Sequence, residues 1–234
     1  MINANGLLVK LKKTLDILAN HMVFVRSNLA IIEGIKELVE EDNDYTMVMN
    51  QSVAFWNMTF HNSWEEIAHS LSKAFDDGQD VISVPSVIDM CEKNRHILEP
   101  VLIEINTKHD DSEERFPNYD AMLQELHRLY DNPTALRKKL KAIRNKQVAH
   151  SDRQIAFGSR EALMLKRTDA EQLSDIAESV INIIAGSLFD TVYCFHVLDD
   201  EKDVKTLLSF AMAGYKQTKV QREKKRKEKA TQKV

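Results

Sequence analysis

The sequence predicts an all-α protein, a single domain of long antiparallel helices. The chain has 234 residues with only 6 Gly and 4 Pro, whereas average usage would give about 16 and 12. A β-sandwich or barrel needs a turn every 8–12 residues or so, and such turns draw on Gly and Pro. Apolar residues also recur at steps of three and four, which is the period of an amphipathic helix.

The first two helices are expected from about residue 6 to residue 41 and from Tyr45 to Phe75. Asp76-Asp77-Gly78 ends the second. The sequence leaves open whether the apolar seam of the first helix packs within one chain or across a dimer. The spacing of the seam is that of a heptad repeat, and its members are Leu8, Leu11, Leu15, Leu18, Met22, Val25, Leu29 and Ile32.

The remaining helices follow from caps and breakers. Pro85 opens a helix that continues to Ile105, because Pro is favoured in the first turn. A polar loop covers residues 107–117, helices are expected over 118–130 and from Thr134 to about Ala149, and 151–168 is predicted to be a loop. Asp169 or Ser174 caps a helix through Val197. We expect residues 1–200 to form one domain and residues 201–234 to form a helix that runs into a basic tail, whose order the sequence leaves open.

Charge is unevenly distributed along the chain. The formal net charge is −4, but nine basic residues between Lys216 and Lys233 stand against Glu223 and Glu228, which leaves −11 for the residues before them. A second basic stretch lies between Thr134 and Ser151 and contains no acid. Basic segments in an acidic chain indicate a polyanionic partner, most simply nucleic acid; a merely solvated tail is the alternative.

The cysteines and the apolar runs indicate the redox state and the cellular compartment of the protein. Cys91 and Cys194 are far apart and form no CxxC pair, so we expect buried thiols and no disulfide. Charges interrupt the apolar runs before they approach the ~20 residues of a membrane span. We therefore expect a soluble cytoplasmic protein with no membrane partner.

Arg144 and His150 form the most informative pair. Six residues apart, they lie about 120° from each other on an ideal helix. They share a face only if the helix ends near Ala149, as the loss of periodicity after His150 indicates. A helix C-terminus favours the imidazolium form of a histidine. Arginine binds phosphate and histidine transfers protons, so the pair suits metal-free cleavage of a phosphodiester.

The segment Arg144-Asn145-x4-His150 resembles the Arg-polar-x(3–5)-His signature of HEPN domains. The surrounding Arg-Asn-Lys-x-x-Ala-His-Ser-Asp is similar to the abortive-infection (AbiU-like) branch of that family. So is the earlier Trp64-x-x-Ile-Ala-x-x-Leu-x-x-Ala-Phe-Asp76, because that branch tends to have a helix ending in Phe-Asp. The resemblance covers roughly residues 1–200.

The resemblance implies a HEPN-like helical bundle that pairs as a homodimer, and a metal-independent endoribonuclease of toxin–antitoxin or phage-defence systems. His150 would be the general acid/base, Arg144 would bind the scissile phosphate, and Asn145 would orient the substrate. Attack of a ribose 2′-OH would give a 2′,3′-cyclic phosphate. No cofactor or metal is expected, and a cognate antitoxin protein is a possible partner. The expected RNA contacts are Lys138, Lys141, Lys146 and Arg153. The tyrosine that some members carry two residues after the histidine is replaced by Asp152, which argues against regulation through it.

Two other functions stay open at this point. One is a non-catalytic helical module that binds RNA or a protein through its basic helix. The other is a metal enzyme that uses His61, Glu65 and His69. On a straight helix these three span about 12 Å, too far for one ion, so polar contacts are the favoured reading.

Overall fold

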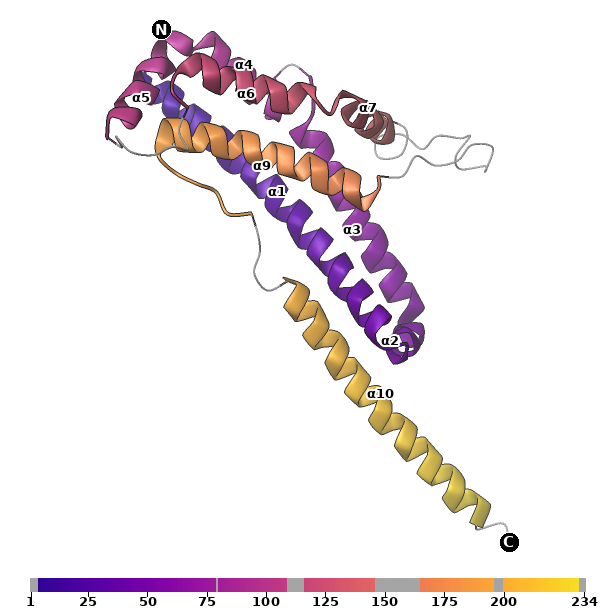
Figure 1. Ribbon diagram of the computed structural model, residues 1–234. Helices are drawn as coiled ribbons and strands as arrows, with labels where there is room; N and C mark the ends of the chain where they lie inside the picture. Colours follow the sequence, from indigo (N-terminus) through magenta and orange to yellow (C-terminus); the bar gives the residue numbers. More distant parts are fainter. Residues whose placement is uncertain (1–3, 79, 109–115, 146–164, 196–199, 232–234) are drawn as a thin grey trace. The chain divides into compact units, whose positions relative to one another are not determined.

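The computed structural model describes residues 4–78, 80–108, 116–145, 165–195 and 200–231. No strand occurs in these ranges, so the predicted all-α fold is confirmed. The helices are α1 (Ala4–Glu41), α2 (Asp44–Met49), the 3-10 helix η1 (Asn50–Ser52), α3 (Val53–Ala74), α4 (Val84–Lys93), α5 (Arg95–Lys108), α6 (Tyr119–Asp131), α7 (Thr134–Ile143), α9 (Arg167–Phe189) and α10 (Asp200–Thr231) (Figure 1).

The chain divides into two compact units. The motif unit comprises residues 1–26 and 65–196, and the tail unit comprises residues 27–64 and 197–234. The boundary between the units falls within α1 and α3, because the second half of α1 and the first half of α3 have a core of their own with α10. One domain over residues 1–200 stays a prediction.

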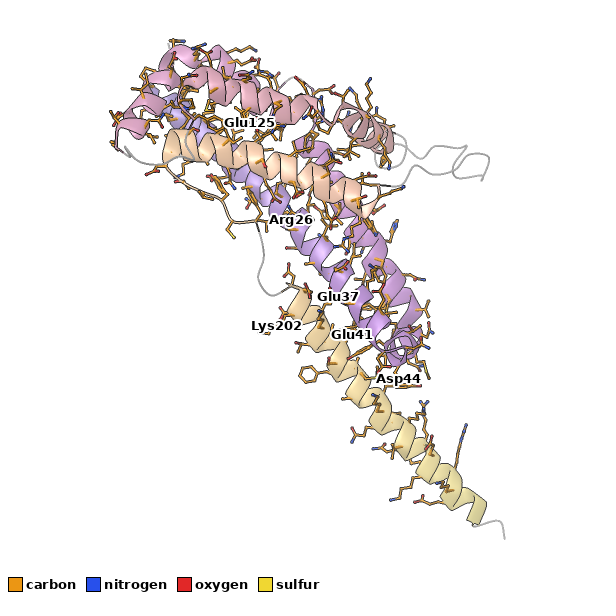
Figure 2. All side chains as sticks on the ribbon, in the orientation of Figure 1. Arg26, Glu37, Glu41, Asp44, Glu125 and Lys202 are labelled. Carbon is orange, nitrogen blue, oxygen red and sulfur yellow. The ribbon has the colours of Figure 1, made fainter. Side chains whose placement is uncertain are left out.

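The core of the motif unit is formed by the first half of α1 and by α4, α5, α6 and α9. The helix pairs α5–α9, α4–α6 and α6–α9 are in contact. Arg26 of α1 forms ion pairs with Glu178 at 2.6 Å and with Asp175 at 2.5 Å, both on α9 (Figure 2). Fully buried apolar side chains fill the space between these helices, among them Leu11, Leu15, Leu18, Met22, Leu98, Met122, Leu126, Val180 and Ile184.

The predicted seam of α1 is buried within a single chain. Six of its eight members are buried, from Leu11 to Leu29. Leu7 is buried at the start instead of Leu8, and beyond residue 27 the buried face includes Ile35 and Leu38 instead of Ile32. The face changes there because Ile35 and Leu38 have different neighbours, the core residues of the tail unit.

The tail unit has a small core of Ile35, Leu38, Trp56 and Leu208. Lys205 of α10 forms ion pairs with Glu37 at 2.5 Å and with Glu201 at 2.6 Å. α1 and α10 approach so closely at Gly34 that an added Cβ would lie 3.0 Å from side-chain atoms of Glu201 and Val204. α10 continues to Thr231, so the segment that carries the basic tail is helical.

Two predicted helices are each interrupted once. The helix expected over 45–75 contains the 3-10 turn η1, and the one that opens at Pro85 breaks at Asn94, whose φ is −111°. Ser83 and Ser86 form a reciprocal cap at the start of α4. The predicted helix over 118–130 is confirmed, with the Asn118 side chain accepting from the Ala121 N–H at 2.8 Å. The predicted loops include residues 109–115 and 151–164, which lie outside the described residues.

The prediction that one helix runs through Val197 is wrong. α9 ends at Phe189, because Asp190 adopts a left-handed conformation with φ 52°. The Asn182 side chain then holds the non-helical segment after it, accepting from the Tyr193 N–H at 2.7 Å and donating to the Tyr193 carbonyl at 3.2 Å. Val192 is consequently 77% exposed. At the other end α9 begins at Arg167, and Asp169 caps it by accepting from the Lys166 N–H.

The two cysteines differ in exposure. Cys91 is buried as predicted, but Cys194 is exposed. The prediction of two buried thiols is therefore wrong for Cys194, which lies in the non-helical segment after α9 rather than on a helix face.

α1 departs from the prediction that no segment could span a membrane. By length and composition alone it qualifies, with a mean hydropathy of 1.3 over an 18-residue window. A core helix of a soluble protein meets the same criterion. Leu11, Leu15, Leu18 and Met22 are fully buried by other parts of the protein, and 33% of the apolar window is buried in all.

Candidate nucleic-acid site

The candidate site is built on α7, the helix of the internal basic stretch. Leu140 and Ile143 are buried and anchor the helix in the motif unit. Arg137, Lys141 and Arg144 follow each other at steps of four and three, so they share one face. The predicted start of this helix at Asn132-Pro133-Thr134 is confirmed. Its predicted end near Ala149 lies outside the described residues.

Arg144 is held by a carboxylate from the end of α3. Its Nη1 lies 2.6 Å from Asp76 Oδ2, and the two side chains are 26% and 28% exposed. Arg144 Nε also donates to Asn145 Oδ1 at 3.2 Å. A guanidinium has five N–H donors, and these two contacts occupy only some of them. Arg144 is thus fixed in direction, and its contacts with the described residues leave donors for an anion.

Two lysines of α7 are also paired with carboxylates. Lys141 donates to both oxygens of Asp77, at 2.8 and 3.0 Å. The hydrogen bond from Lys141, with the charges of Lys141 and Arg144, holds the pKa of Asp77 below its ordinary value. Lys139 forms an ion pair with Asp169. Burial opposes ionisation of Asp169, but hydrogen bonds from Lys139 and the Lys166 backbone lower its pKa.

A cavity of about 250 Å³ lies beside these residues. Its apolar wall includes Phe75 and Leu140, and Tyr130 contributes an aromatic ring. Its charged lining has four cations and one acid. The Arg137 guanidinium lies 3.7 Å from the centroid of the Tyr130 ring. Burial raises the pKa of Tyr130, so its hydroxyl stays protonated. The charged lining residues are Arg137, Lys138, Lys141, Arg144 and Asp77.

The structure brings together part of the predicted site. Arg144, Lys138 and Lys141 line one cavity, and Asn145 contacts Arg144. Three other predicted residues lie outside the described residues: His150, Lys146 and Arg153. For these three, the predicted roles remain predictions.

Sequence reasoning missed four residues that shape the site. Asp76 and Asp77 were read as a helix stop, and Tyr130 as the end of a helix. Arg137 was counted within the basic stretch but not assigned to the site. The spacing of Arg137, Lys141 and Arg144 could have indicated a shared face. No local sequence pattern predicts that Asp76 pairs with Arg144, because the two residues are 68 positions apart in the chain.

The described residues contain no cluster of three His, Cys, Asp or Glu side chains that could hold a metal ion. His61, Glu65 and His69, all three exposed on α3, therefore do not form such a cluster.

Comparison with protein families gives one match. The model of the HEPN family AbiU2 matches residues 8–207. Neither a curated protein nor a solved structure matches the chain significantly.

Proposed function

The chain belongs to the AbiU2 family of HEPN domains, an abortive-infection family, and on this premise we propose that it is a metal-independent endoribonuclease. The observation that carries the proposal is the fixed guanidinium of Arg144. Asp76 holds it at 2.6 Å, at the edge of a cavity lined by further cations. A preorganised positive charge is what a transition state at phosphorus requires.

In the proposed reaction Arg144 binds the non-bridging oxygens of the scissile phosphate with the N–H donors that Asp76 and Asn145 leave available. His150 accepts the proton of the ribose 2′-OH. The 2′-oxygen attacks phosphorus, the bond from phosphorus to the 5′-oxygen breaks, and the leaving oxygen takes up a proton. The products are a 2′,3′-cyclic phosphate and a 5′-OH. Asn145 orients the substrate beside Arg144.

RNA would be attracted by the basic residues around this site and by α10. Lys138 and Lys141 line the cavity, and Lys146 and Arg153 follow in the chain. The basic residues of α10 from Lys216 through Lys227 are exposed. Such contacts to phosphate are independent of sequence and depend on salt.

We further propose that the protein acts in the cytoplasm as a homodimer, in a phage-defence or toxin–antitoxin role, with a cognate antitoxin protein as partner. The family relationship supports this role. A homodimer would provide two copies of the Arg144–His150 motif, so that one histidine could act as base and the other as acid.

The decisive experiment incubates end-labelled single-stranded RNA and tRNA with the purified protein in EDTA. Wild type is compared with His150→Ala, Arg144→Gln and the matched control His127→Ala. His127 is a surface histidine of α6, bonded to Glu92 at 2.8 Å. Wild type and His127→Ala should release fragments that end in a 2′,3′-cyclic phosphate, and the other two should not.

Other results would point elsewhere. Salt-sensitive RNA binding without cleavage by any variant would favour the non-catalytic binding module. Equal cleavage by wild type and His150→Ala would contradict the proposed role of His150. Cleavage that EDTA abolishes would contradict metal independence.

A further inference from the structure

The cavity beside α7 has an unusual polar lining. Among the described residues, two buried side-chain atoms lack a hydrogen-bond partner, Ser72 Oγ and Arg137 Nε. Both residues line this one cavity, one from α3 and the other from α7. Buried polar groups in proteins are almost always bonded, so each exception needs an explanation. Two such donors in one cavity indicate a ligand that accepts hydrogen bonds.

Ser72 and Arg137 come from separate helices and are differently placed. Ser72 is 5% exposed, well below the surface. The Arg137 side chain is 19% exposed, and its guanidinium carbon lies 3.7 Å from the centroid of the Tyr130 ring. Its other contacts are long: Nη2 lies 3.5 Å from Thr134 Oγ1 and 3.8 Å from Asp131 Oδ1. Arg137 is therefore oriented by an aromatic ring rather than by a short ion pair.

Among the described residues, Arg137 and Lys138 are the two cations of the lining that form no ion pair shorter than 3.8 Å, and Arg137 is the less exposed of the two. Lys141 is engaged by Asp77, and Arg144 by Asp76. The single acid of the lining, Asp77, is thus already neutralised. Donors outnumber acceptors around the cavity, and Arg with hydroxyl groups is the donor set that proteins use for phosphate.

The size of the cavity limits what it can hold. At about 250 Å³ it is smaller than the roughly 300–1,000 Å³ of pockets that enclose a whole small molecule. It can hold a phosphate group with part of its sugar. Arg144 lies at the same cavity, one helical turn past Lys141 and two past Arg137.

We propose that this cavity is a second phosphate subsite, in which Arg137 and Ser72 bind the backbone phosphate next to the scissile one. The inference rests on the proposed function in one respect, namely that the phosphate belongs to an RNA strand. Arg137 and Ser72 would bind and align the strand, and Arg144 would act at the bond that breaks.

The test measures binding without cleavage. A fluorescent 2′-O-methyl RNA 12-mer lacks the attacking hydroxyl, so its dissociation constant can be measured by anisotropy whether or not the protein is a ribonuclease. We expect Arg137→Gln to weaken binding about ten-fold, the effect of losing one charge-assisted hydrogen bond. The matched control is Arg128→Gln, an exposed arginine of α6 paired with Glu125, which should change binding by less than about two-fold.

A second variant covers the case in which Arg137→Gln fails to fold. Ser72→Ala removes a buried hydroxyl that has no hydrogen-bond partner in the described part of the chain, so we expect it to melt no lower than wild type while it binds the 12-mer less tightly. Dissociation constants of Ser72→Ala and of folded Arg137→Gln equal to that of wild type would overturn the subsite.

Competition identifies the source of the phosphate. AMP and inorganic phosphate should displace the 12-mer only weakly, because each offers a single phosphate. Displacement by AMP at a lower concentration than by unlabelled 12-mer would overturn the assignment to RNA in favour of a free nucleotide.

The subsite and the proposed function can fail separately. Cleavage by wild type with an unchanged KM in Arg137→Gln would contradict the subsite alone, and binding lost in Arg137→Gln without cleavage by wild type would contradict the ribonuclease alone.

Discussion

Asp76 and Arg144 are 68 positions apart in the chain, and their side chains meet at 2.6 Å. Asp76 lies two residues past the end of α3 at Ala74, and Arg144 directly follows the last residue of α7. The carboxylate fixes the direction of the guanidinium, and the neighbouring Asn145 accepts from its Nε. We interpret Asp76 as a positioning residue, which acts on the substrate through Arg144.

Asp76→Asn should therefore impair turnover more than binding. The amide cannot form the ion pair, so Arg144 loses its fixed orientation, and misplacement of a catalytic group by about 1 Å can cost about a hundred-fold in rate. We expect kcat for RNA cleavage to fall about ten-fold or more with a smaller change in KM, measured by steady-state kinetics.

The control for that substitution is Glu125→Gln, which breaks a comparable ion pair with Arg128 at 2.6 Å on α6. Its kcat should equal that of wild type. A kcat for Asp76→Asn as high as that of the control would contradict the positioning role.

Removal of the basic end of α10 should lower the affinity for RNA and also make that affinity less dependent on salt concentration. Deletion of residues 216–234 removes nine cations and two acids but no residue of the tail-unit core, whose α10 member is Leu208. Each lost phosphate contact should reduce the slope of log K against log salt by about 0.7 for single strands. Fluorescence anisotropy at several salt concentrations measures both quantities.

A chain in which residues 216–234 are scrambled at constant composition separates charge from sequence. It should bind as wild type does, because counterion release depends on the number of cations. Loss of binding in the scrambled chain would mean that the tail recognises its partner through specific contacts instead.

His21 should make the motif unit less stable in mild acid. Burial lowers the pKa of His21, the nearby charges of Lys73 and His69 lower it further, and Glu66 opposes them. The unfolded chain therefore binds a proton at a higher pH than the folded one does. The stability associated with neutral His21 is complete above the unfolded pKa of about 6.5 and is lost as the pH falls through the folded value.

The measurement is the free energy of unfolding by urea between pH 7.5 and 5. His21→Gln should flatten this profile, because the substituted side chain does not titrate. His96→Gln, at an exposed position of α5, serves as the control and should retain the wild-type slope. A His21→Gln profile parallel to that of wild type would assign the acid sensitivity to other groups.

The two cysteines should differ sharply in reactivity. Burial raises the pKa of the Cys91 thiol to about 12, against a smaller opposing effect of the Tyr119 hydroxyl, and the thiolate is the reactive form. Cys194 is exposed. Iodoacetamide at pH 8 should add one group to the native protein, at Cys194, and two in denaturant, as read by intact mass and peptide mapping. Alkylation of native Cys91 would show that α4 opens readily.

Patterns within a few turns of the chain determined the helices. The seam from Leu11 to Leu29, the helix over 118–130 and the start of α7 at Thr134 were all predicted, because helix period and breakers are local properties. The resemblance around Arg144 and Asn145 identified the family for the same reason: the motif is contiguous. The prediction of a helix through Val197 failed because apolar spacing continues past Asp190. The Asn182 side chain instead bonds the backbone of Tyr193, eleven residues later, in a non-helical segment.

The sequence alone thus determined that this protein is helical, which family it belongs to, and which arginine to examine. Only the tertiary structure decided what surrounds that arginine: Asp76 as its partner, and a cavity that Ser72 of α3 shares with Arg137 of α7. It also decided that α1 and α3 divide between two compact units. The reason is physical. Periodicity states which face of a helix is apolar, but the packing of distant segments decides which neighbour that face meets and which buried charges are paired.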